Sequence, residues 1–234
     1  MIDSRLMFTR SALPVKSRRD FILSALTGAF GLALGAGAGV GGIAHGAVPR
    51  GTRILVLGDS LSAEYGLRRG TGWVALMQTR LDKEHAGVGV VNASISGETT
   101  SGGRTRLPAL LSQHKPTHVI IELGANDALR GLPVRATHDN LLAMTRAARQ
   151  AGCRVALLGM QVPPNYGGQY TREFGEIFGQ VARAESAQLV PFLLRGVADV
   201  PDAERWFQPD RIHPVEAAHP RILANVWPVI EAWF

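Results

Sequence analysis

After Pro49, short apolar runs alternate with longer segments in which apolar residues recur at helical spacing. The short runs are rich in β-branched residues and predict parallel strands buried on both faces, at 53–57, 88–93, 118–123, 154–160 and 188–193. The longer segments predict helices over 72–83, 101–112, 136–151, 171–187 and 214–232. This alternation predicts an α/β domain, a three-layer α/β/α sandwich around a parallel sheet of about five strands.

The first polar segment of interest follows the run 53–57 and reads GDSLS, with Ser60 at its centre. Parallel strands end at one edge of their sheet, and ligands bind at that edge where the strand order reverses. A serine placed there can act as a nucleophile, or it can cap the helix that follows. The G-x-S-x-G elbow of α/β-hydrolases is absent, so that fold is not the source of a nucleophilic serine.

Two further loops follow the second and third predicted strands. Gly97 lies in the loop after 88–93, where it can permit an unusual backbone angle or bring a backbone N–H close to a developing oxyanion. Asn126 follows 118–123 and can offer its side-chain amide to the same oxyanion, as a donor whose charge does not depend on pH. The alternative is a turn in which Asn and Asp side chains bond their own backbone, and we expect Asp127 to take that local role.

The segment just before the last predicted helix contains Asp210 and His213, separated by two residues. In a tight loop this spacing lets Asp210 bind one ring nitrogen of His213 while the other nitrogen faces Ser60. His219 has no upstream carboxylate at a comparable spacing. Four further histidines lie in helices, strands or loops that do not obviously approach strand ends, namely His85, His114, His118 and His138. His213 is therefore the preferred general base.

Taken together, a serine after strand one, a glycine after strand two, an asparagine after strand three and a C-terminal Asp-x-x-His resemble the SGNH (GDSL) hydrolase superfamily. The resemblance extends from about Thr52 to Trp233. It is closest to the bacterial multifunctional acyl-thioesterase, lysophospholipase and arylesterase group, through three blocks: VNASISGETTSGGRTRLPALLSQHKP (91–116), ELGANDALRG (122–131) and VPPNYGGQYTREF (162–174). Ala125 and Arg211 stand where that group more often has glycine, and Arg211 could alter the shape of its loop or favour an anionic substrate.

The resemblance implies a flavodoxin-like fold and two-step acyl transfer from esters or thioesters. It implies Ser60 as nucleophile, His213 as base and Asp210 as its orienting carboxylate. The oxyanion hole would consist of the Ser60 and Gly97 backbone N–H groups and the Asn126 amide. The loop after the fourth strand would help cover the acyl chain, with substrate-binding residues Pro164, Asn165 and Tyr166.

Substrate and assembly are less closely defined by these residues. We expect medium or long acyl groups, with a carbohydrate O-acetyl esterase and a non-catalytic exported binding protein as the alternatives. The chemistry requires no metal or cofactor, and the sequence contains no cluster of metal-ligating residues. We expect the protein to be a monomer.

Composition and charge exclude some classes of function. With 46% hydrophobic and 19% charged residues among 234, the sequence is that of a globular protein and not of a disordered one. The first 46 residues hold five of the 25 Lys and Arg and two of the 19 Asp and Glu, so the remainder has a formal charge of +3 in place of +6. Without a basic run, a nucleic-acid partner is not expected.

The N-terminal segment is interpreted as an export signal. Adjacent Arg18 and Arg19 precede an uncharged stretch over 21–44 that contains seven glycines and is only weakly hydrophobic. This pattern resembles a twin-arginine signal, which is recognised by the bacterial twin-arginine export machinery. We therefore predict a signal over 1–46 and a hydrolase domain over 47–234, in the periplasm or secreted. Cleavage could follow Ala44, Gly46 or Ala47, and an uncleaved membrane anchor is the alternative.

Cys153 is the only cysteine, so no intramolecular disulfide can form. It precedes the apolar run 154–160, and we interpret it as a small buried hydrophobic residue in preference to a nucleophile.

Overall fold

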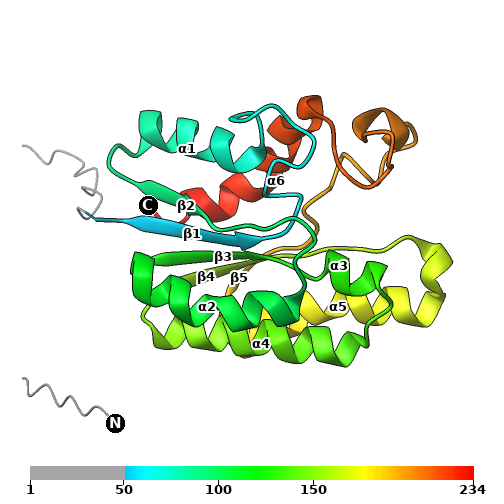
Figure 1. The fold of residues 1–234 in the computed structure, drawn as a ribbon, viewed down its shortest axis with the longest axis horizontal. Coiled ribbons are helices and arrows are strands. Elements are labelled where there is room, and N and C mark those ends of the chain that lie inside the picture. The colour runs from blue at the N-terminus through cyan, green and yellow to red at the C-terminus, as the bar shows by residue number, and fades with distance from the viewer. Residues whose placement is uncertain (1–50) are drawn as a thin grey trace, which may run out of the picture. The chain divides into compact units, whose positions relative to one another are not determined.

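The predicted strands form one parallel sheet in the computed structural model, which describes residues 51–234 (Figure 1). The predicted export segment 1–46 lies outside the described residues. The strands are β1 (Arg53–Gly58), β2 (Gly89–Asn92), β3 (His118–Glu122), β4 (Arg154–Leu158) and β5 (Gln188–Val190). Their order in the sheet is β2-β1-β3-β4-β5, and every neighbouring pair is parallel.

The central position of β1 determines where the loops lie. It pairs with β2 on one side, with Val56 opposite Asn92, and with β3 on the other, with Gly58 opposite Glu122. The strand order reverses at β1, because β2 lies on one side of it and β3, β4 and β5 follow on the other. The loops that follow β1, β2 and β3 therefore emerge side by side at one edge of the sheet.

Helices cover both faces of the sheet. Helices α1 (Trp73–Glu84) and α6 (His219–Glu231) lie on one face, and α2 (Thr100–His114), α4 (Val134–Gln150) and α5 (Gly168–Ala184) lie on the other (Figure 1). A short helix, α3 (Ala125–Leu129), directly follows β3. The predicted three-layer α/β/α sandwich with a five-stranded parallel sheet is confirmed.

The core lies between these layers. Residues 54–57 of β1 are completely buried, as expected for a strand with helices on both sides. The apolar stripe of α1 contributes Trp73 and Met77 to one layer, and that of α5 contributes Phe174 and Phe178 to the other. Cys153 is also buried, and its thiol donates to the Pro116 carbonyl at 3.1 Å, which agrees with the role expected for it.

Prolines account for two differences from the predicted boundaries. The last helix begins at His219 and not at 214, because Pro214 pairs with Phe207 in an antiparallel bridge. The Val215 N–H donates to the Trp206 carbonyl at 2.8 Å and extends this pairing. Likewise β5 ends at Val190 and not at 193, since Pro191 has no N–H to continue the ladder. The other predicted strands and helices agree with the observed ones to within a few residues, but the short helix α3 was not predicted.

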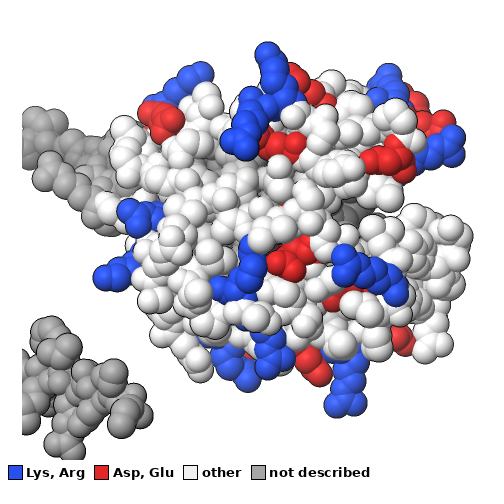
Figure 2. All heavy atoms as spheres, in the orientation of Figure 1, with Lys and Arg blue, Asp and Glu red and all other residues white. Residues whose placement is uncertain are grey.

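Charged side chains of both signs are interspersed on the face shown in Figure 2, without a continuous basic stripe among the described residues drawn there. Within 51–234, no helix combines the length and the hydropathy needed to cross a bilayer.

Gly159, just after β4, provides a test of the packing at the end of the sheet. A Cβ at this position would lie 2.3 Å from the Pro191 carbonyl oxygen, which belongs to backbone and cannot rotate away. We expect Gly159→Ala to lower the free energy of unfolding by about 1–3 kcal/mol, measured by urea unfolding. In the matched control Gly175→Ala, the new methyl group enters open space within α5, so stability should rise by about 0.5–1 kcal/mol. Equal effects of the two substitutions would contradict this account.

Candidate active site

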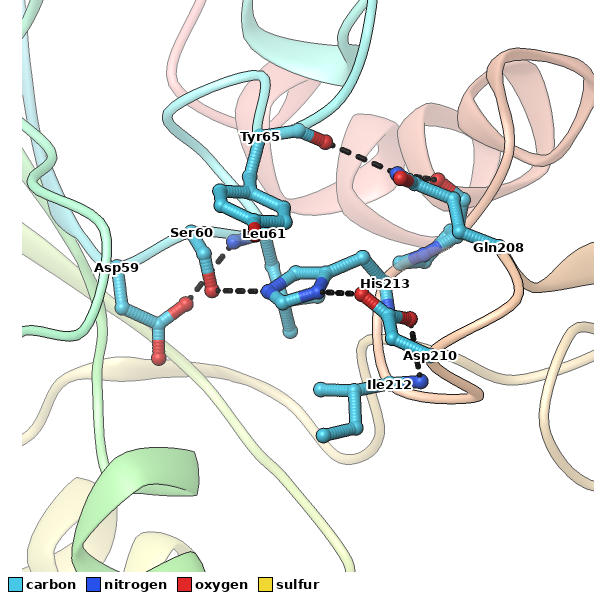
Figure 3. Close-up of polar contacts among 9 residues, drawn as sticks. Asp59, Ser60, Leu61, Tyr65, Gln208, Asp210, Ile212 and His213 are labelled. Atoms are coloured by element: carbon cyan, nitrogen blue, oxygen red, sulfur yellow. Dashed lines mark hydrogen bonds and ion pairs between the residues drawn. The ribbon is translucent and has the colours of Figure 1, made fainter.

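Ser60 lies in a turn directly after β1, at the carboxyl edge of the sheet (Figure 3). The turn is closed by the Asp59 carbonyl, which accepts from the N–H groups of Ser62 at 3.2 Å and Ala63 at 3.0 Å. The next helix begins only at Trp73, so the alternative in which Ser60 caps that helix does not apply.

His213 joins Ser60 to Asp210. Its Nε2 lies 2.8 Å from Ser60 Oγ and its Nδ1 lies 2.6 Å from Asp210 Oδ2 (Figure 3). An ionised carboxylate can only accept, so Nδ1 bears the hydrogen and the Ser60 hydroxyl donates to Nε2. The Tyr65 ring packs against the imidazole, with 4.2 Å between ring centroids. The structure therefore brings the three predicted residues into one hydrogen-bonded chain.

Asp210 is held ionised by the loop that contains it. Its Oδ1 accepts from the backbone N–H groups of His213 at 3.0 Å and Ile212 at 2.9 Å. The backbone bond from His213 has the largest effect, followed by the imidazole and Ile212, and together they lower the pKa of Asp210 to about 2. Arg211 adopts a positive φ of 60° in this turn. That conformation favours glycine, so Arg211 affects the loop through its backbone shape, and its side chain is exposed.

The loop is also tied to the segment that contains the serine. The Gln208 backbone N–H donates to the His213 carbonyl at 2.7 Å. Its side-chain amide donates to the Tyr65 carbonyl at 2.9 Å (Figure 3) and to the Pro214 carbonyl at 3.1 Å. These contacts fix the position of the imidazole relative to the Ser60 turn.

The three predicted oxyanion donors lie in the adjacent loops. Within 51–234 the backbone N–H groups of Ser60 and Gly97 donate to no protein acceptor. Gly97 has a φ of 79°, and its loop is anchored by the Ile95 N–H, which donates to the Gly58 carbonyl at 3.0 Å. Asn126 uses one amide hydrogen in a bond of 3.0 Å to Asp59 Oδ2, which leaves its second amide hydrogen for a ligand.

The Asp127 side chain does not take the local turn role that was expected from the sequence. Its buried carboxylate accepts from the Thr100 N–H at 2.9 Å and from the Thr100 hydroxyl, at the start of α2. The Asp127 side chain therefore satisfies a free donor at the N-terminus of α2 and joins two helices. A partner 27 residues away cannot be identified from the tetrapeptide GAND alone.

Two buried carboxyl groups beneath the Ser60 turn were not identified from the sequence. Asp59 and Glu122 are each 1% exposed, and they contact one another. Burial raises the pKa of Asp59 to about 6, against opposing hydrogen bonds of which that from Leu61 is the largest. Burial, and then the nearby Asp59, raise the pKa of Glu122 well above its usual range. The sequence feature that could have indicated this pair is Glu122, a glutamate at the end of an otherwise apolar strand.

Three further histidines of the described residues have partners of their own. His219 is buried, and its Nδ1 accepts from the Trp73 N–H at 3.1 Å. His118 is buried in β3 against Trp233, with 4.5 Å between ring centroids. His85 stacks on Phe234 at 4.4 Å. No group of His, Cys, Asp and Glu in the described part of the chain is arranged to hold a metal ion.

The predicted substrate-binding residues form a short 3-10 helix, Pro164–Tyr166, between β4 and α5. Asn165 is exposed, and the half-buried Tyr166 ring stacks on Tyr170 with 6.3 Å between centroids. Among residues 51–234, no hydrogen bond or ring contact joins Asn165 or Tyr166 to Ser60 or His213. These residues thus lie in the expected loop after β4.

Comparisons with known proteins find similarity in sequence and in fold. A model of the GDSL-like Lipase/Acylhydrolase family matches residues 56–221. Esterase TesA of Pseudomonas aeruginosa is 51% identical over 178 residues, which cover 76% of this chain and 87% of that protein. Thioesterase 1/protease 1/lysophospholipase L1 of Escherichia coli K12 is 40% identical, over 72% of this chain and 78% of that protein. A crystal structure of TesA superimposes with a TM-score of 0.74 at 50% identity, over 78% of this chain and all of that one.

The buried carboxyl groups predict a pH dependence of stability. Both pKa values are raised in the folded protein, so the stabilisation from these groups is complete below about pH 4. It is lost as the pH rises through about 6 for Asp59 and through a higher value for Glu122. Between about pH 5 and pH 8 we expect the free energy of unfolding to fall by about 1–3 kcal/mol in urea titrations. Glu122→Gln should reduce this fall, and an unchanged slope in that variant would refute the assignment.

Proposed function

The chain belongs to the GDSL-like Lipase/Acylhydrolase family and is a serine ester hydrolase, and from this premise we propose that Ser60, His213 and Asp210 form its catalytic triad. The observation that supports the triad is the continuous chain of hydrogen bonds from Ser60 Oγ through the imidazole to Asp210. On attack, the Ser60 oxygen bonds to the substrate carbonyl carbon and its proton passes to His213 Nε2. Asp210 keeps the imidazole in the required tautomer and stabilises the imidazolium that forms.

The remaining steps follow from the same groups. His213 returns the proton to the leaving alcohol or thiol as the bond to the acyl carbon breaks, which leaves an acyl-serine. Water then attacks the acyl carbon while His213 takes its proton; the bond to Ser60 Oγ breaks, Oγ takes that proton from His213, and the acid is released. In both steps the negative charge on the former carbonyl oxygen is stabilised by the Ser60 and Gly97 N–H groups and the Asn126 amide, which constitute the proposed oxyanion hole.

Exposed apolar side chains support acyl esters and thioesters as the substrate class. Four large hydrophobic residues of the described chain are about half exposed: Tyr65, Ile95, Leu129 and Ile212. One lies in each of the four segments that contain the proposed catalytic groups. Apolar residues around a polar reaction centre can bury part of an acyl chain. The loop that includes Pro164, Asn165 and Tyr166 opens at the same edge of the sheet and is proposed to cover the distal part of that chain (Figure 1).

Export is also part of the proposal. The paired Arg18 and Arg19 ahead of a weakly hydrophobic segment support a twin-arginine signal and a periplasmic or secreted enzyme. An uncleaved membrane anchor remains the alternative.

A chain-length series tests the reaction and the substrate class. With p-nitrophenyl acetate, butyrate, octanoate and palmitate and with octanoyl-CoA, we expect kcat/KM to rise from acetate to octanoate and Ser60→Ala to abolish turnover. Ile95→Ser combined with Ile212→Ser should lower kcat/KM several-fold more for octanoate than for acetate, because only the longer chain contacts these side chains.

Other results would point to the alternatives. Turnover limited to acetate would favour a carbohydrate O-acetyl esterase. Absence of Ser60-dependent turnover, together with absence of labelling by a fluorophosphonate, would favour a non-catalytic binding protein.

Substitution of Asn126 tests the oxyanion hole. Removal of one such donor costs about 10²–10³-fold in kcat, so we expect Asn126→Ala to lower kcat on p-nitrophenyl butyrate by that factor with little change in KM. The urea midpoint provides the control for folding. A kcat within about twofold of the wild type would remove Asn126 from the mechanism.

A further inference from the structure

Glu122, at the end of β3, holds the residues on either side of Ser60. Its Oε2 accepts from the Asp59 N–H at 3.2 Å and from the Ser62 hydroxyl at 2.8 Å, and both partners are buried. Space for this carboxyl exists only because residue 58 is glycine: a Cβ there would lie 2.8 Å from Oε2. One side chain of the neighbouring strand thus fixes the backbone immediately before the nucleophile and the residue two positions after it.

Asp59 connects the same turn to the proposed oxyanion donor. Its Oδ1 accepts from the Leu61 N–H at 3.0 Å (Figure 3), and its Oδ2 accepts from the Asn126 amide at 3.0 Å. Both oxygens therefore accept from donors, as a carboxylate can and an amide cannot. The bond to Asn126 determines which way its amide group faces, because it occupies one of the two N–H bonds and directs the other.

The two carboxyl groups cannot both be charged at this depth. Each is 1% exposed, and two carboxylates in contact away from water share a proton. Asp59 is the charged member, since both of its oxygens face donors, and the positive His213 that forms during the reaction favours that charge. Burial, and then the charge on Asp59, raise the pKa of Glu122 most, so Glu122 is the member that retains the proton and can donate it to the Asp59 side chain.

We propose that Glu122 and Asp59 are positioning residues, Glu122 as a neutral acid that fixes the Ser60 turn and Asp59 as the carboxylate that orients the Asn126 amide. This inference rests on the proposed function. Neither residue touches the substrate. They act through Ser60 and Asn126, which they hold in the geometry that the transition state requires.

Two substitutions of Glu122 distinguish the effect of its hydrogen bonds on kcat from the effect of its side-chain volume. Glu122→Gln keeps a carbonyl for Asp59 N and Ser62 Oγ and an N–H for the Asp59 carboxylate, so kcat on p-nitrophenyl butyrate should stay within about threefold of the wild type. Glu122→Met keeps a similar volume but leaves those donors without a partner, and kcat should fall about 10–100-fold with KM little changed. Equal kcat values for the Met and Gln variants would overturn the proposal, whether both are close to the wild type or both are reduced.

A stability control excludes a general effect of weakened packing. Thr145→Val in α4 removes a buried hydroxyl bond of 2.8 Å to the Leu141 carbonyl, far along the chain from the Ser60 turn. It should lower the urea midpoint and leave kcat unchanged. A fall in kcat comparable to that of Glu122→Met would show that lost stability alone accounts for both.

A double-mutant cycle tests the action of Asp59 through Asn126. In Asp59→Asn the new amide group can accept from only one of the two donors, Leu61 N–H and the Asn126 amide, and presents an N–H to the other. We therefore expect kcat to fall about 10–100-fold. In the Asn126→Ala background the same substitution should have little further effect, since the group that it orients is gone. Reductions that multiply in the double variant would overturn the assignment.

The side-chain amide signals of Asn126 in NMR spectra test the geometry without turnover, and Asn126→Ala identifies them. They should shift in Asp59→Asn and Glu122→Met and remain in place in Glu122→Gln. If this pattern holds while the wild type lacks Ser60-dependent turnover, the proposed function fails and the positioning stands. If turnover is normal and the signals do not respond, the positioning fails alone.

Discussion

The parallel pairing of β1 with β2 on one side and β3 on the other determines where the nucleophile and the proposed oxyanion donors lie. Because the three strands run in the same direction, the loops that contain Ser60, Gly97 and Asn126 emerge at one edge. The same pairing places Gly58 opposite Glu122, so that a carboxyl group can lie beneath the Ser60 turn. Fold and site therefore depend on one alignment of strands, and a shift in its register would separate all of these groups together.

The parts of this structure that repeat a general pattern could be predicted from the sequence. Apolar β-branched runs and helical spacing determined the order of strands and helices, because burial on both faces of a sheet selects such residues. Ser60, Asn126 and the Asp210–His213 pair were identified because each follows a strand or precedes the last helix. The close approach of Asp210 to His213 was expected from their spacing, since a contact over so few residues is a property of the loop itself.

The contacts that escaped prediction join residues far apart in the chain. Glu122 and Asp59 are 63 positions apart, and Asp127 bonds Thr100 across 27 positions. In the sequence, Glu122 is one polar residue at the end of an apolar strand, and Asp127 resembles a turn residue. Their roles depend on which loops meet at the sheet edge and on how little water reaches them, and neither is recorded in local spacing. The start of the last helix was misplaced for a similar reason, since Pro214 pairs with Phe207.

The contacts of Gln208 have a consequence for motion in this protein. Because Gln208 bonds the carbonyls of His213, Pro214 and Tyr65, the loop with the imidazole is attached to the segment with the serine. These contacts restrain any motion that would separate nucleophile and base. Exposed positions in the connection between β5 and this loop, such as Asp199 and Pro201, can then vary in sequence while the reacting atoms keep their alignment.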